Sequence, residues 1–140
     1  MKQLIECVPN FSEGRNMEVI RQITEVIEKA EGVKLLDVDP GATTNRTVVT
    51  FVGTPDEVVE TAVAVIAKAK ELIDMRNHHG DHPRFGATDV CPLVPVSNIT
   101  MEETAQYARK LAERVGNELG VPVYCYENAA FEEKRRNLAN

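Results

Sequence analysis

The sequence has few of the residues that would indicate a disulfide-bonded protein. Its 140 residues include only three cysteines, Cys7, Cys91 and Cys125, which lie far apart along the chain. An odd number of widely spaced cysteines predicts no disulfide framework, and the absence of a Cys-x-x-Cys pair disfavours a zinc or thiol redox site. We therefore expect the cysteines to be small buried side chains in a reducing, cytoplasmic environment.

Long apolar runs and net positive charge are also absent. No apolar stretch approaches the ~20 residues that cross a bilayer, and the start of the chain (MKQ) does not open a signal peptide. The formal net charge of −6 argues against non-specific binding to nucleic acid, although a local basic pocket for a small anion is compatible with it. With 43% hydrophobic and 27% charged residues, the chain is typical of one globular domain over residues 1–140.

The apolar patterns predict alternating strands and helices. Thr54 followed by Pro55 and Glu57, and Thr100 followed by Glu103, are typical starts of helices. Strand-like runs cover residues 3–8, 33–38, 47–52, 90–96 and 121–126, and apolar residues at helical spacing cover 16–30, 54–73 and 100–115.

The resulting order, β-α-β-β-α-β-α-β, predicts an α/β (α+β) two-layer sandwich. Its first six elements match the ferredoxin-like βαββαβ unit, and one further αβ unit follows. We expect a mixed β-sheet with the helices on one face, and a second face that is covered by something else or is unusually polar. The strands at 33–38 and 47–52 are expected to form a hairpin with a long loop.

Three loops collect the polar residues that a core cannot use. They cover residues 9–15, 39–46 and 78–84, and each lies at the end of a predicted strand or helix. Loops held by a rigid scaffold are where binding groups are usually found. These loops are therefore the candidate functional regions.

The third loop contains every histidine of the chain, namely His78, His79 and His82. One interpretation is a solvated polar loop without special chemistry. A second is a metal site formed by His78, His82 and Asp81, although Pro83 disfavours the helix that would bring the two histidines together. A third is a general acid/base at His82, because Pro83 restricts the His82 backbone to extended conformations and so fixes its direction. His78 and His79 would then be solvated neighbours.

The other two loops have alternative interpretations as well. Asp39 and Asn45 are typical turn residues that satisfy the backbone of a hairpin. Alternatively, Asp39 is a carboxylate suited to binding a cationic amidine or ammonium group, and the planar guanidinium of Arg46 is suited to binding a carboxylate. The first loop is either a simple connection or a site where Asn10 and Ser12 donate hydrogen bonds to a ligand near the next helix.

Several separated blocks of the sequence resemble the glutamate formimidoyltransferase family, in its N-terminal subdomain. They occur in the same order as in the family and extend over nearly the whole chain. The blocks are residues 5–15 (IECVPNFSEGR), 36–39 (LDVD), 44–48 (TNRTV), 80–95 (GDHPRFGATDVCPLVP) and 123–127 (VYCYE).

The resemblance implies transfer of a formimino group between N-formimino-L-glutamate and tetrahydrofolate, a step of histidine degradation and folate one-carbon metabolism. Tetrahydrofolate would be a co-substrate, and no metal is expected. The acid/base histidine of the family falls on His82. We expect Asp39 to stabilise the amidinium-like charge and Arg46 to hold a substrate carboxylate. The residues expected to bind substrate or folate are Asn10, Ser12, Asn45 and Arg84.

In the family a second subdomain follows this one, and folate lies in the cleft between the two. The chain ends at Asn140 without that C-terminal subdomain. We therefore expect the catalytic half of a two-subdomain site, completed by a second-subdomain subunit or by a homodimer, with small-molecule substrates and neither nucleic acid nor membrane as a partner. The alternative is a non-catalytic short homologue that binds a folate-like ligand or a partner through its uncovered sheet face.

Overall fold

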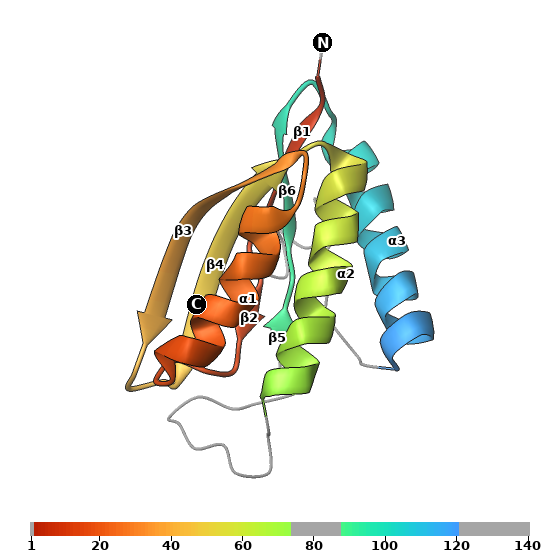
Figure 1. Ribbon diagram of the computed structural model, residues 1–140. Coiled ribbons are helices and arrows are strands. Elements are labelled where there is room, and N and C mark those ends of the chain that lie inside the picture. Colours follow the sequence, from red (N-terminus) through yellow and green to blue (C-terminus); the bar gives the residue numbers. More distant parts are fainter. Residues whose placement is uncertain (1, 74–87, 121–140) are drawn as a thin grey trace, which may run out of the picture.

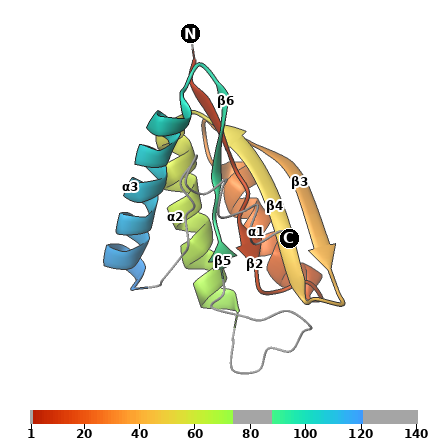
Figure 2. The same ribbon diagram turned by 180° about the vertical axis from the view of Figure 1, so that it is seen from behind.

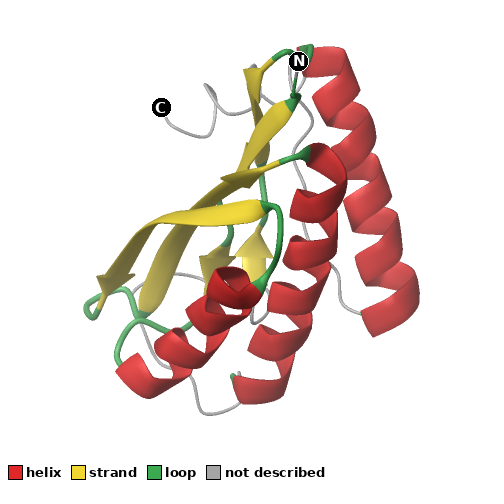
Figure 3. Ribbon diagram, turned by 45° about the horizontal axis from the view of Figure 1, so that its top comes forward, coloured by secondary structure: helices red, strands yellow, loops and turns green. Residues whose placement is uncertain are grey.

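A computed structural model describes residues 2–73 and 88–120, which form one sheet with three helices on one of its faces (Figures 1 and 3). The predicted two-layer α/β sandwich is therefore confirmed. The elements are β1 (Leu4–Cys7), β2 (Asn10–Phe11), α1 (Met17–Lys29), β3 (Val33–Gly41), β4 (Arg46–Gly53), α2 (Pro55–Leu72), β5 (Thr88–Val90), β6 (Leu93–Ser97) and α3 (Met101–Leu119).

The sheet is built around β4. This strand pairs with β3 on one side and with both β1 and β2 on the other, while β6 pairs with β1 and β5 pairs with β2. Because β1 and β2 follow each other along one line, as do β5 and β6, the sheet has the strand order of a βαββαβ ferredoxin-like unit. Every pairing between the described strands is antiparallel, and the strand predicted at 121–126 lies outside the described residues.

The sheet has four strand positions across its width, and prolines divide two of them into pairs of short strands, β1 with β2 and β5 with β6. The sequence predicts one strand at 90–96, where Pro92 and Pro95 favour an edge or a bulge, and no strand in the first loop. The structure has two short strands, β5 and β6, in place of that one, and the two-residue strand β2 in the first loop. Pro9 separates β1 from β2 and Pro92 separates β5 from β6, since proline has no N–H to contribute to the ladder. Their carbonyls still pair, because the Val8 N–H donates to Pro92 (3.1 Å) and the Val49 N–H donates to Pro9 (3.0 Å). The lines are thus interrupted but remain joined.

β3 continues beyond the point where the sequence predicts a loop. Asp39, Pro40 and Gly41 are strand residues, and Pro40 lies opposite Thr47 of β4. Among the described strands β3 pairs only with β4, so the missing N–H of Pro40 falls on an edge where it breaks no pairing. The long hairpin loop is therefore a wrong prediction, and the connection is a short turn at residues 42–45.

A β-bulge determines which side chains of β3 face the helices. The register shifts between Leu35, opposite Phe51, and Asp37, opposite Thr50, so that Leu36 is an extra residue. The side-chain alternation consequently changes phase at Leu36, which is exposed. After the bulge, Asp37 and Asp39 lie on the face that the helices leave open.

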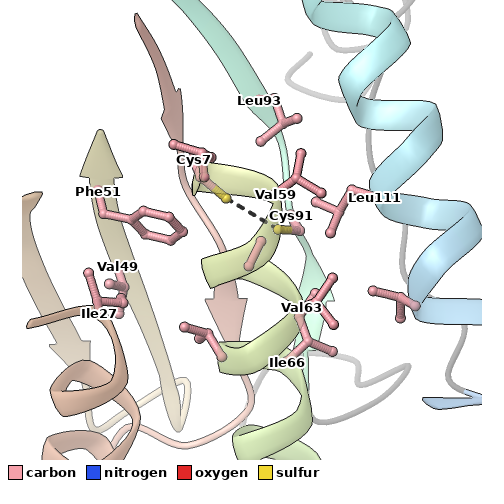
Figure 4. Packing of buried hydrophobic residues seen from close by; sticks show 14 of the residues in the cluster. Cys7, Ile27, Val49, Phe51, Val59, Val63, Ile66, Cys91, Leu93 and Leu111 are labelled. Carbon is pink, nitrogen blue, oxygen red and sulfur yellow. Dashed lines mark hydrogen bonds between the residues drawn. The ribbon is translucent and has the colours of Figure 1, made fainter. Parts of the chain in front are cut away.

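The core fills the space between the sheet and the helices. Along β4, buried and half-buried residues alternate, and the completely buried Val49 and Phe51 face the helices (Figure 4). Cys7 and Cys91 are completely buried thiols that form no disulfide, and their Sγ atoms lie 3.4 Å apart. The prediction of small buried cysteines is thereby confirmed for these two, whereas Cys125 lies outside the described residues.

The other face of the sheet, seen from behind the helices in Figure 2, carries both polar and apolar residues. Glu6 and Val94 are paired in register on this face, next to Val52 of β4. Val94 and Val96 are exposed, whereas Glu6 and Val52 are half-buried. None of the three helices in the described part of the chain covers this face, and none is long and apolar enough to cross a membrane.

Two helices begin at the predicted threonines, but the two caps differ. The Thr100 hydroxyl accepts the Glu103 N–H (3.0 Å) while the Glu103 carboxylate accepts the Thr100 N–H (2.9 Å), which is a complete capping box. The Thr54 hydroxyl instead donates to the Glu57 carboxylate and makes no bond to the helix backbone. That hydrogen bond holds the pKa of Glu57 below its usual value.

This difference predicts unequal effects of two matched substitutions. We expect Thr100→Ala to lower the free energy of unfolding by about 1 kcal/mol, because it leaves backbone N–H groups of α3 without their cap. Thr54→Ala should cost less than about half of that, since Pro55 at the first helical position already replaces one N–H. Denaturant titrations of the two variants measure both values, and equal losses would contradict the assignment of the caps.

Candidate functional site

The nominated polar residues that the structure describes gather at one end of the sheet. There the segment after β2 runs past the β3–β4 turn into the start of α1, and α2 ends and β5 begins at the same end (Figure 1). Pairing of Asn10 with Val48 and of Phe11 with Thr47 brings the first loop directly beside β4. Two of the three candidate loops are thus neighbours in space.

Gly14 and Asn45 join these two loops. The Gly14 N–H donates to Asn45 Oδ1 over 2.9 Å in a buried environment, although 31 residues separate them in sequence. A Cβ atom at Gly14 would overlap the carbonyl of Gly41 and both the N and O atoms of Arg46. Only glycine therefore lets the first loop approach the β3–β4 hairpin this closely.

Four further hydrogen bonds hold the first loop, two of them across the junction and two within the loop. The Thr47 hydroxyl donates to the Glu13 carbonyl, and Arg15 Nε donates to the Ala42 carbonyl (2.7 Å). The Glu13 carboxylate accepts the backbone N–H groups of Arg15 and Asn16, each at 3.0 Å. Glu13 is consequently held by its carbonyl on one side and by its carboxylate on the other, so the loop that leads into α1 is fixed at both ends.

Asp39, Arg46 and Asn10 lie on the same face of the sheet. Asp39 and Asn10 both pair with Val48, one from each side, and Arg46 lies two residues before Val48, opposite Gly41. Since residues 46 and 48 share a face, these three side chains lie on the face that the helices leave open. Asp39 is exposed, Asn10 and Arg46 are half-buried, and Arg46 Nε is buried. The structure therefore brings together a carboxylate, a guanidinium and an amide.

The other two nominated residues in the described part of the chain are buried. Ser12 is completely buried and Asn45 is 5% exposed. Asn10 uses one of its amide hydrogens to bond the Val8 carbonyl (3.1 Å), which holds its side chain against the segment between β1 and β2. The predicted binding roles of Ser12 and Asn45 stay predictions, whereas the bond of Asn45 to Gly14 makes Asn45 part of the junction between the loops.

Sequence reasoning missed Gly14 and Thr47. Both lie in the quoted blocks, but a glycine or threonine next to charged residues is ordinary in a loop, and no local signal indicates a close contact with a segment 31 residues away. His82 and Arg84 lie outside the described residues, as do His78, His79 and Asp81, so the acid/base and metal interpretations of that loop stay predictions.

Comparison with known proteins gives consistent matches over the whole chain. The family model described as "Formiminotransferase domain, N-terminal subdomain" matches residues 4–140. The formimidoyltransferase-cyclodeaminase of Gallus gallus is 58% identical over 138 residues, which cover 99% of this chain and 26% of that protein. The glutamate formimidoyltransferase of Streptococcus pyogenes serotype M1 is 45% identical over 139 residues, covering 99% of this chain and 46% of that protein.

The chain thus spans about a quarter of the first relative and about half of the second. Among solved structures, that of MupZ from Pseudomonas fluorescens is similar with a TM-score of 0.47 and 10% sequence identity, covering 92% of this chain and 89% of MupZ.

The close contact at Gly14 predicts a large effect of a single methyl group. We expect Gly14→Ala to lower the free energy of unfolding by about 3 kcal/mol, because the new Cβ meets main-chain atoms that cannot move aside. Gly116→Ala is the matched control, since Gly116 lies inside α3 and, apart from its own stretch of helix, no atom of the described residues lies within 4 Å of the place that its new methyl group would take. Alanine there should stabilise the protein by about 0.5–1 kcal/mol. Denaturant titration measures the free energy of unfolding of both variants. An unchanged free energy of unfolding in Gly14→Ala would contradict the close contact.

Proposed function

The chain belongs to the formiminotransferase family, as its N-terminal subdomain, and on that premise we propose that it takes part in transferring a formimino group between N-formimino-L-glutamate and tetrahydrofolate. The observation that carries the proposal is the arrangement of Asp39, Arg46 and Asn10 on the open face of the sheet. The family's relatives are named as formimidoyltransferases, and this arrangement offers groups that suit such a substrate.

The substrate has two kinds of charged group. Its glutamate part carries carboxylates, and its formimino group is an amidine, which bears positive charge when protonated. The Arg46 guanidinium can bind a carboxylate with two parallel hydrogen bonds. The Asp39 carboxylate, on the neighbouring strand of the same face, can stabilise the amidinium. Asn10 adds an amide that can donate or accept a hydrogen bond.

The proposed reaction needs one proton transfer. Folate N5 attacks the amidine carbon, so that a bond from N5 to carbon forms and the bond from carbon to the glutamate nitrogen breaks. N5 loses a proton and the departing nitrogen gains one. A single acid/base group that first accepts and then donates this proton balances the step, and His82 is our candidate. The described residues that flank its segment, at the ends of α2 and β5, lie at the site end of the sheet (Figure 1).

Two substrates must be held in line for this reaction, and alignment alone can contribute a large part of the rate increase. The open face of the sheet is one wall of the proposed site. We propose that tetrahydrofolate binds between this wall and a second subdomain or a second copy of the chain, because the relatives are two to four times longer than the matched region. The thiols of Cys7 and Cys91, which form no disulfide with each other, fit a reducing cytoplasmic compartment.

Formimino transfer can be tested directly with the purified chain. The chain is mixed with N-formimino-L-glutamate and tetrahydrofolate, alone and together with the part of the Streptococcus pyogenes enzyme that the match leaves uncovered. We expect transfer in at least one of these mixtures, and His82→Ala should lower kcat by about 10²–10⁴-fold because it removes the proton carrier. His78→Ala is the matched control and should leave kcat within about threefold of the wild type.

Two results would count against this proposal in different ways. Transfer by His82→Ala at the rate of the wild type would overturn the acid/base assignment alone. Absence of transfer in every mixture would overturn the enzymatic function, and ligand binding without turnover would then support the non-catalytic binding domain.

The two charged residues on the open face should affect different kinetic constants. We expect Arg46→Gln to raise the KM for N-formimino-L-glutamate about 10–100-fold, because it removes a charge-assisted pair of hydrogen bonds. Asp39→Asn should mainly lower kcat, because the charge it stabilises grows during the reaction. Asp37→Asn, on the same strand and face, is the matched control and should leave both constants within about twofold. A normal KM in Arg46→Gln would refute its assignment to the carboxylate.

A further inference from the structure

We propose that Asn45 is a positioning residue, which fixes the loop that carries Asn10 against the turn that precedes Arg46. The inference rests on the proposed function for the role of Arg46, but the contact itself is a property of the fold. Asn45 is 5% exposed and lies immediately before Arg46 at the start of β4. Its role therefore acts through its neighbours rather than on the reacting atoms.

The backbone conformation of Asn45 is the first feature that supports the positioning role. Its φ of 52° is in the left-handed region, which asparagine tolerates better than other non-glycine residues. The Asn45 N–H donates to the Ala42 carbonyl (3.3 Å), which closes the turn. Arg46 is thus directed into β4 by a turn whose last residue has an unusual conformation.

The hydrogen bond to the Asn45 side chain is the second feature that supports the positioning role. Its Oδ1 accepts the Gly14 N–H (2.9 Å), and the place for a Gly14 side chain is taken by the main chain of Arg46. A movement of the Gly14 segment therefore requires a movement of the Arg46 backbone. Because the Gly14 segment begins at β2, which carries Asn10, the Asn45 amide links the segment that carries Asn10 to the start of the strand that carries Arg46, in addition to the β2–β4 pairing and the Thr47–Glu13 hydrogen bond.

This arrangement predicts an effect on substrate binding rather than on the chemical step. Loss of the Asn45 acceptor would loosen the contact between the two loops, although the β2–β4 pairing remains. The bound substrate would then lose part of the contacts that it makes equally in the ground state and the transition state. Such a loss raises KM and leaves kcat nearly unchanged. A residue that only supports the fold would lower the amount of active protein without changing KM.

The test compares two variants at this position with one elsewhere in the full 140-residue chain. Asn45→Gly keeps the positive φ and removes the acceptor, whereas Asn45→Asp keeps both. Asn98→Gly is the matched control, because Asn98 has a φ of 55° and its amide donates to the Lys2 carbonyl (2.9 Å) at the opposite end of the sheet. The first readout is hydrogen exchange of the Gly14 amide, and the second is KM against kcat in the transfer assay.

We expect the Gly14 amide to exchange at least about tenfold faster in Asn45→Gly, and to keep its protection in Asn45→Asp and Asn98→Gly. The KM for N-formimino-L-glutamate should rise about tenfold in Asn45→Gly with kcat within about threefold, and Asn45→Asp should recover most of it.

The outcomes separate the two proposals. Unchanged Gly14 exchange in Asn45→Gly would overturn the contact whether or not the chain is active. Faster exchange with an unchanged KM would overturn the positioning role and leave the proposed function standing. Absence of transfer by the wild type would overturn the proposed function, while the exchange data would still decide the contact.

Discussion

The contact between the Gly14 backbone and the β3–β4 turn is the constraint on which the candidate site depends. It is a main-chain approach that a single methyl group would prevent, and it is completed by hydrogen bonds from Gly14 to Asn45 and from Thr47 to Glu13. Both bonds are made at adjacent residues of the first loop, Glu13 and Gly14. The first loop is consequently held against the β3–β4 turn, and this contact joins the strands that carry the side chains of the open face.

Local signals in the sequence predict the elements that depend on local chemistry. The capping box at Thr100 and Glu103 satisfies its own backbone groups, so its residues are sufficient to locate the start of α3. The end of the first strand before Pro9 is likewise predicted, and Pro92 favours an edge or a bulge. The continuation of each line beyond its proline escapes sequence-based prediction, because it depends on a carbonyl that pairs with a distant strand. Similarly, Pro40 is typical of a loop, and only the edge position of β3 makes it a strand residue.

The site is predictable only in part for the same reason. Asp39, Arg46 and Asn10 belong to three different strands, and their common face follows from the register with Val48 and from the bulge at Leu36. Without that bulge the alternation along β3 would place Asp39 on the face that packs against the helices, and nothing in the sequence specifies the bulge. The burial of Ser12 and Asn45 is equally hard to predict, because small polar residues in loops are normally exposed.

The central claim is that the first loop and the hairpin turn form one cooperative unit. A double-mutant cycle with Asn45→Gly and Thr47→Val tests it, because these substitutions remove separate bonds to the adjacent residues Gly14 and Glu13. The unfolding free energies of the wild type, both single variants and the double variant give the coupling energy. Cooperative holding predicts a coupling of at least about 1 kcal/mol, whereas losses that add within about 0.3–0.5 kcal/mol would show that the two bonds act independently and would contradict the claim.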